Sequence, residues 1–206
     1  MTQRTVLPPD FYARDTLIVA RELLGQRLVR VISGVRLSGY IVEVEAYKGA
    51  DDLASHAARG KTLRNAAMFG PPGHAYVYFT YGMHYCLNVV TEPEGIPAAV
   101  LIRAIAPIEG IDVMRQNRFG QPDENLTNGP AKLCQALRID RALNGVPLTM
   151  ASGLFIEKDQ VPMPDQIAVS PRVGVHGDER ALTLPWRFFL RDNPYVSLRR
   201  CLKSHD

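Results

Sequence analysis

The sequence predicts a mixed α+β fold: a single domain with a curved, mainly antiparallel sheet, flanking helices and a protruding β-hairpin. The length of 206 residues suits one large domain or two at most, and we expect residues 1–206 to form one. Hydrophobic residues make up 46% and charged residues 22%, which is ordinary globular composition. The segments with a strand pattern are joined by short connections, which leave little room for crossover helices between parallel strands.

Hydrophobic periodicity and turn residues place the elements of the first half. A helix is predicted over 15–25, and strands are predicted over 27–32, 36–47, 74–80 and 84–91. The first strand pair turns at Ser33-Gly34, and the second turns tightly at Tyr81-Gly82 as a hairpin. The polar stretch 48–73 is rich in Gly and Pro and indicates a long loop, and such loops in compact domains are often functional.

The second half contains further strands and two helices. The pattern predicts a buried strand over 98–105, a helix over 108–119, a polar loop over 121–128, a helix over 129–137, and strands over 154–158 and 186–191. Pro130 falls at the first position of its helix, where a proline is well tolerated.

Several classes of protein are excluded by composition. No apolar run approaches the ~18 residues of a membrane helix, and Met1–Arg4 leads to Pro8-Pro9 without the apolar core of a signal peptide. Cys86, Cys134 and Cys201 form no C-x-x-C pair, so neither a disulfide framework nor a cysteine zinc site is indicated. We expect a cytoplasmic protein that is not secreted and not bound to a membrane.

The positive charge is mostly arginine. Of 24 basic residues, 19 are arginine and 5 are lysine, although the formal net charge is only +3. Arginine binds phosphate in a bidentate manner and stacks on rings, which suits contact with nucleic acid. A GC-rich genome would also favour arginine, so this observation leaves both interpretations open.

One predicted strand carries two carboxylates on one face. Alternation along a strand places Glu43, Glu45 and Tyr47 on one side and Val42, Val44 and Ala46 on the other. The simple interpretation is an exposed acidic face. The functional one is a general base at the end of a strand that borders a polar loop. His56, in that loop, lacks further ligands at workable spacing, so no metal site is expected.

Six of the eight tyrosines lie between residues 40 and 85. Strand tyrosines commonly serve cross-strand packing. Tyr81, at a hairpin tip beside Gly82, has little to pack against, and a protruding aromatic side chain there suits entry into a base stack. Tyr47 and Tyr78 would then be candidates to enclose an extruded base.

Three polar residues interrupt apolar or helical segments. Arg103 lies within the apolar run VLIRAI and needs a partner, which could be structural, Glu45 or a phosphate. Asn88 within CLNVV needs partners for its amide. Lys132 lies in the first turn of the helix GPAKLCQAL, whose free backbone amides could bind a phosphate.

Several stretches, taken together in chain order, carry a specific likeness. They are VEVEAY, SHAARGKTLRNAAMFGPPGHAYVYFTYGMHYCLNVV, VLIRAIAPIEGIDVMRQNR, NGPAKLCQAL, PRVGVHG and LRDNPYVS. In this order they resemble the alkyladenine (3-methyladenine, methylpurine) DNA glycosylases, from about Leu7 to Ser197. The chain resembles a minimal, bacterial-type form of that family. Thr80 and His84 depart from vertebrate members, which carry larger apolar or aromatic residues beside the wedge.

The resemblance implies a role for each matching residue. Glu45 is similar to the base that activates the attacking water, and Arg103 and the carbonyl of Val173 match groups that hold this water. The pocket for the flipped base is implied at Tyr47, His56, Tyr78 and Asn88. Tyr81 and Met83 are expected to enter the duplex, and Arg64, Arg118 and Lys132 to contact the DNA backbone.

The implied reaction is hydrolysis of the N-glycosidic bond of an alkylated or deaminated purine in double-stranded DNA. No lysine lies beside Glu45 in the matched segments, which argues against a Schiff-base lyase step. We therefore expect a monofunctional enzyme in base excision repair that acts as a monomer without cofactor. Two alternatives remain: a hydrolase of free nucleosides, and a non-catalytic module that binds distorted duplex nucleic acid.

Overall fold

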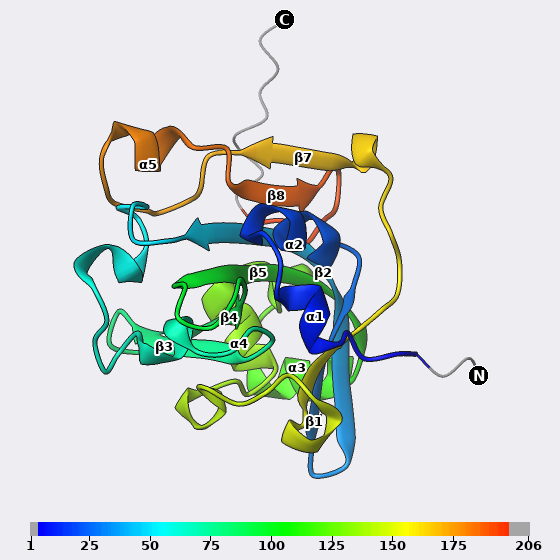
Figure 1. Cartoon of the computed structure of the whole chain (residues 1–206). Helices are drawn as coiled ribbons and strands as arrows, with labels where there is room; N and C mark the ends of the chain where they lie inside the picture. Colours follow the sequence, from blue (N-terminus) through cyan, green and yellow to red (C-terminus); the bar gives the residue numbers. More distant parts are fainter. Residues whose placement is uncertain (1–3, 198–206) are drawn as a thin grey trace, which may run out of the picture.

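A single antiparallel sheet organises the part of the chain, residues 4–197, that the computed structural model describes (Figure 1). Its strands are β1 (Arg27–Ile32), β2 (Val35–Lys48), β3 (Ala75–Thr80), β4 (His84–Val90), β5 (Ala98–Glu109), β6 (Leu154–Glu157), β7 (Ile167–Ser170) and β8 (Arg187–Leu190). The strand order is β3-β4-β5-β2-β1-β6, and β8 pairs with both β2 and β7. The curled sheet and the helices around it confirm the α+β class and the antiparallel pairing. Cys201 and residues 1–3 lie outside the described residues.

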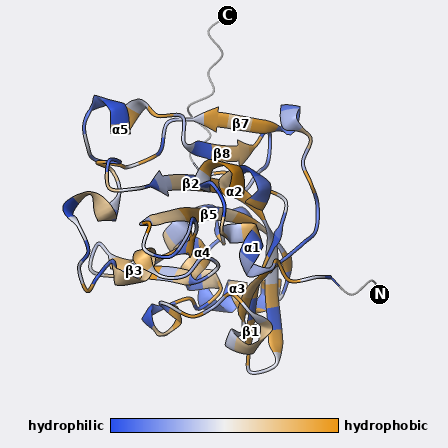
Figure 2. Cartoon of the chain, in the orientation of Figure 1, coloured by the Kyte–Doolittle hydropathy of each residue, from blue (hydrophilic) through white to orange (hydrophobic). Residues whose placement is uncertain are grey.

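Short helices cover the sheet. They are α1 (Pro9–Tyr12), α2 (Thr16–Leu23), α3 (Ile111–Asn117), α4 (Pro130–Ala136) and α5 (Glu179–Thr183). The carboxylate of Asp15 accepts hydrogen bonds from two backbone N–H groups at the start of α2 and so caps this helix. Pro130 is the first residue of α4, as predicted. The main core joins α2 and α4 to the sheet through Leu23, Ile102 and Leu133. Hydrophobic residues concentrate in α2 and β7, whereas α5 is hydrophilic in part (Figure 2).

The predicted start of the helix over 108–119 was wrong. Ile108 and Glu109 belong to β5, and α3 begins at Ile111. The strand continues because Glu109 pairs with Ser38 of β2, and its carboxylate accepts hydrogen bonds from Ser38 and Arg36. The short elements α1, β7 and α5 were not predicted, because four or five residues show too little periodicity.

A β-bulge in β2 corrects the predicted strand faces. The register with β5 shifts before Glu43, where Val42 is an extra residue in β2, and shifts back after Glu43, where Arg103 is an extra residue in β5. As a result Val42 packs in a small cluster with Ala104 and Phe189, apart from the main core that holds Val44 and Ala46. Glu43, Glu45 and Tyr47 still share one side, because Arg103 contacts both carboxylates and Tyr47 donates to Glu45.

The hairpin β3–β4 ends in a tight turn. Thr80 pairs with His84, and Tyr81 and Gly82 both have positive φ, at 50° and 68°. The side chains of Tyr81 and Met83 are 80% and 71% exposed at this tip.

The long loop between β2 and β3 contains two 3-10 helices, η1 (His56–Arg59) and η2 (Ala66–Phe69), which sequence analysis did not predict. Among residues 4–197 no helix is long and apolar enough to cross a membrane.

Candidate active site

Glu45 lies at the centre of the candidate site and is fully buried. Its Oε1 accepts a hydrogen bond from the backbone N–H of Val173 at 2.7 Å and lies 3.1 Å from Nη1 of Arg103. Its Oε2 accepts a hydrogen bond from the hydroxyl of Tyr47 at 2.9 Å. The exposed acidic face considered from the sequence is therefore wrong. Three separate segments converge on one carboxylate.

A second buried carboxylate, Glu43, shares Arg103 with Glu45. Nε of Arg103 donates to Glu43 at 2.9 Å, and Nε of Arg187 donates to the same oxygen at 2.7 Å. The cluster thus holds two carboxylates and two guanidinium groups, all nearly or fully buried. An unpaired charge there would cost several kcal/mol. Of the partners considered for Arg103, the structure shows Glu45, together with Glu43.

Arg172 contacts β2 from another side, and sequence analysis did not identify it. Its guanidinium carbon lies 4.7 Å from the ring centre of Tyr47 and 5.1 Å from that of Trp186. It forms a two-pronged ion pair with Asp52, at 2.5 and 2.7 Å, and both side chains are fully buried. Burial, followed by the charge of Glu45, raises the pKa of Tyr47, so its hydroxyl stays protonated and can donate to Glu45.

An aromatic group lies beside Tyr47 in the same apolar cluster. The rings of His56 and Tyr78 meet edge to face with centres 4.4 Å apart. Nδ1 of His56 lies 2.8 Å from the hydroxyl of Tyr76, a contact that sequence analysis missed. The imidazole is exposed on one side, but partial burial and then the charge of Arg64 lower its pKa. His56 is therefore neutral near pH 7.

Two further predicted residues join this group. Asn88 is buried, and its Nδ2 donates to the carbonyl of Tyr76 at 3.0 Å. The amide therefore has a hydrogen-bond partner, as the sequence analysis requires. Arg64 is exposed and donates to the carbonyl of Phe79 at 3.0 Å, with its guanidinium 5.9 Å from the ring centre of Tyr78. The long loop is thereby tied to the hairpin.

Arg118 and Lys132 lie elsewhere, at the packed pair α3 and α4. Nη1 of Arg118 donates to Gln135, and the side chain is buried. Lys132 donates to Asn128 at 2.7 Å, and burial, followed by the charge of Arg118, lowers its pKa. The hydrogen bonds of both side chains stay within α4 and the segment next to it, so the structure does not bring them into the Glu45 cluster.

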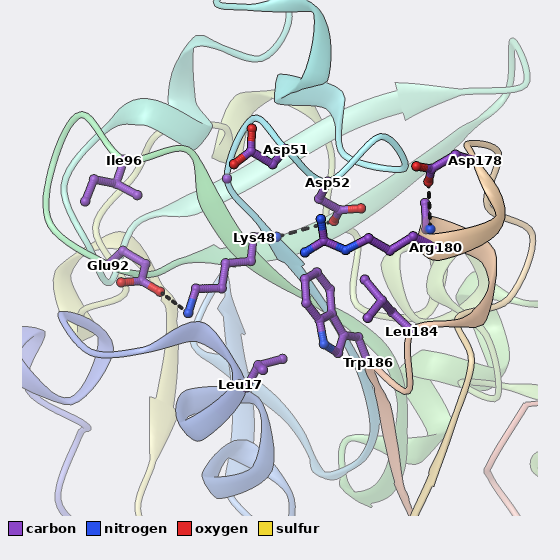
Figure 3. A pocket seen from close by; sticks show the side chains of 12 residues that line it. Leu17, Lys48, Asp51, Asp52, Glu92, Ile96, Asp178, Arg180, Leu184 and Trp186 are labelled. Atoms are coloured by element: carbon purple, nitrogen blue, oxygen red, sulfur yellow. Dashed lines mark hydrogen bonds and ion pairs between the residues drawn. The ribbon is translucent and has the colours of Figure 1, made fainter.

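A pocket of about 520 Å³ opens beside Lys48, at the end of β2 (Figure 3). Several of its charged groups have partners: Lys48 pairs with Glu92 and with Asp15, and Asp178 caps α5. Trp186 on its wall shares Arg172 with Tyr47, so this pocket is separated from Glu45 by the Arg172 side chain. Across residues 4–197, no three His, Cys, Asp or Glu side chains gather closely enough to hold a metal ion.

Comparison with known proteins identifies the family. Residues 10–194 match the family model described as methylpurine-DNA glycosylase. The chain belongs to this family. Members of this family are DNA repair enzymes that hydrolyse N-glycosidic bonds, and the chain is therefore an enzyme of that class.

Curated relatives agree with the family assignment. A protein of Carboxydothermus hydrogenoformans is 53% identical over 192 residues, covering 93% of this chain and 98% of its own length. Proteins of Bacillus cytotoxicus and Bacillus mycoides are each 48% identical, over 201 and 200 residues, with 92% of this chain and 98% of their own length covered. All three carry the name "Putative 3-methyladenine DNA glycosylase". The methylpurine-DNA glycosylase assignment therefore holds over nearly the whole chain.

Proposed function

We propose that this enzyme flips alkylated or deaminated purines out of double-stranded DNA and hydrolyses their N-glycosidic bond with a water activated by Glu45. The substrate class is 3-methyladenine, 7-methylguanine, hypoxanthine and ethenoadenine. The observation that carries the proposal is the buried carboxylate of Glu45, held between Arg103 and the Val173 N–H and bordered by aromatic side chains. The reaction leaves an abasic site and involves no lyase step and no cofactor.

The chemistry follows from the charges around Glu45. In the proposed step, Glu45 accepts a proton from water while the water oxygen forms a bond to C1′ of the sugar. The C1′–N bond breaks, and its electron pair leaves with the purine. The transition state resembles an oxocarbenium ion, which a nearby carboxylate stabilises. Arg103 and the carbonyl of Val173 would hold the water. The Tyr47 hydroxyl that now occupies Oε2 would give way to it.

The aromatic group supplies a binding site for a cationic base. A purine between Tyr47 and the pair His56–Tyr78 would gain cation–π attraction of about 0.5–2 kcal/mol when it is N-methylated. A neutral His56 adds no charge that would repel such a base. Asn88 would face the base from its strand and discriminate against normal guanine.

The exposed hairpin tip supports base flipping. Tyr81 and Met83 would fill the gap left by the extruded nucleotide. Arg64, exposed beside the hairpin, would contact a backbone phosphate. Arg118 and Lys132 are proposed as backbone contacts on sequence grounds alone. We also propose that the enzyme acts on DNA inside the cell as a monomer.

The variant Glu45→Gln tests the function. The amide would fit the site but could not accept the proton, so base release should fall by about 10²–10⁴-fold while binding of lesion DNA is largely kept. The measurement is single-turnover release of free base from methylated duplex DNA. Near-normal excision by the variant would show that Glu45 is not the base. Glu109→Gln, in the ion pair with Arg36, is the matched control and should retain activity.

The same assay separates the alternatives. A non-catalytic binder would release no base from any duplex with the unmodified enzyme, and a nucleoside hydrolase would act on the free nucleoside more rapidly than on DNA. Duplexes that each carry one defined lesion would then rank the substrates.

A further inference from the structure

Glu43 has a more complete set of partners than Glu45. The residue is fully buried, and its two oxygens accept four hydrogen bonds, from Nε of Arg103, Nε of Arg187, and the hydroxyl and backbone N–H of Ser197. Three of these bonds reach Oε1 and one reaches Oε2. The side chain is fully buried and is held at both oxygens, which makes Glu43 a firm anchor for its partners.

Arg103 is held along its whole guanidinium edge. Nε donates to Glu43 at 2.9 Å, Nη1 lies 3.1 Å from Oε1 of Glu45, and Nη2 donates to the hydroxyl of Ser197 at 3.2 Å. The group is planar, so three contacts at three nitrogens fix its rotation as well as its position.

We infer that Glu43, together with Ser197, is a positioning residue that fixes the guanidinium plane of Arg103 beside Glu45 and the attacking water. Arg187 donates to the same oxygen of Glu43 as Arg103, and its Nη2 donates to the carbonyl of Ser197 at 2.8 Å, which closes the ring of contacts. The inference rests on the proposed function, because it assigns Glu43 a role through Arg103 in the Glu45 reaction.

The physical reason is competition between the two carboxylates for one cation. With Glu43 in place, Arg103 offers Glu45 a single nitrogen, and the other oxygen of Glu45 contacts only the Tyr47 hydroxyl. Without Glu43, the planar group would turn to a two-pronged pair with Glu45, since Arg and carboxylate favour that geometry. Such a pair would cover the oxygen that the water requires.

Glu43→Gln is the first test. The substituted amide keeps the volume but offers an N–H₂ where Ser197 or an arginine also donates, so Arg103 should lose its fixed plane. We expect the single-turnover rate of base release to fall by about 10- to 100-fold, in line with small misplacements of reacting groups. The dissociation constant for lesion DNA should change less than about threefold, because Glu43 does not reach the surface. Glu109→Gln serves again as the control.

A double variant separates positioning from simple stabilisation. If Glu43 acts through Arg103, Glu43→Gln added to Arg103→Ala should lower the rate by less than about threefold beyond Arg103→Ala alone. If Glu43 only stabilises the fold, the two losses in rate should multiply, and that result overturns the inference. Should Glu43→Gln fail to fold, Ser197→Ala removes only the bridging hydroxyl. The same cycle applies to it, with an expected loss of about 3- to 10-fold.

Failure of this inference can be told from failure of the proposed function. If Glu45→Gln abolishes base release while the Glu43 and Arg103 effects multiply, the function stands and the positioning role is wrong. If Glu45→Gln retains activity, the function itself is wrong, and the Glu43 inference falls with it.

Discussion

Arg172 and Asp52 together connect the loop after β2 to the strand that carries Glu45. Arg172 donates to the carbonyls of Ala46 and Ala181 as well as to Asp52, so one side chain joins three segments. It also lies against the ring of Tyr47. Because Val173 follows it directly and donates to Glu45, Arg172 sets the position of both groups that contact the carboxylate from this side.

Asp52→Asn should therefore destabilise the protein strongly. The change leaves the buried Arg172 charge without its counterion, and breaking a buried pair in this way costs about 3–5 kcal/mol. Chemical denaturation followed by circular dichroism measures the loss. The neighbouring Asp51 is exposed and makes the matched control, since Asp51→Asn should change stability by less than about 0.5 kcal/mol. Equal stability of the two variants would contradict the role given to Arg172.

At the scale of elements, the hairpin β3–β4 has side chains at its tip that are mostly exposed. Tyr81 adopts positive φ, which is unusual for a residue other than glycine, and its side chain is mostly exposed. By contrast Phe79 and Tyr85, nearer the sheet, pack with ring centres 5.1 Å apart. The tip is thus exposed, while aromatic packing holds the hairpin nearer the sheet.

Tyr81→Ala should weaken capture of the lesion more than the hydrolytic step. Without the wedge, less of the damaged nucleotide is flipped out, and the unstacking cost of a few kcal/mol is not offset. The measurement compares excision by the variant and the unmodified enzyme on a well-stacked lesion and on one in a mismatch or single strand. The substitution should reduce excision of the mismatched or single-stranded lesion less than excision of the well-stacked one. An equal loss on both, with a lower melting temperature, would mean that Tyr81 is structural. Met150→Ala, also at an exposed apolar residue, is the control.

The sequence predicted the elements better than the contacts between them. The strand over 27–32, the hairpin turn at Tyr81-Gly82 and Pro130 at the start of α4 depend on local signals, and all three were correct. The bulge at Glu43 has no such signal, and it moved Val42 to the other face. Asp52 and Arg172 are 120 positions apart, so no local pattern could pair them. The resemblance to the family pointed to Glu45 and Arg103, but Glu43, Arg187 and Ser197 became visible only through their contacts.

At the scale of the whole molecule, the fold collects charge in two ways. Buried arginines are paired with carboxylates inside, as in the Glu43 and Asp52 clusters, while others such as Arg64 remain at the surface. These two clusters hold equal numbers of arginines and carboxylates, so the formal net charge of +3 comes from residues outside them. Contacts of surface arginines with a phosphate backbone make DNA binding dependent on salt.

Removal of divalent metal should leave base release unchanged. The proposed reaction uses a carboxylate base and an arginine, and the part of the chain that the structure describes brings no three metal-ligating side chains together. The check is excision with excess EDTA at constant ionic strength, compared with untreated enzyme. A loss that one specific divalent ion restores would contradict the expected independence from metal.

The sequence positions of the partners of Glu43 also determine when the site can form during translation. Its contacts reach across 144 positions to Arg187 and 154 positions to Ser197. Chains emerge from the ribosome beginning at the N-terminus, and contacts between distant residues form late in folding. A nascent chain that has exposed β2 and the hairpin still lacks Arg187 and Ser197. If these residues orient Arg103 as we propose, a chain that ends before them should meet DNA without excising bases from it.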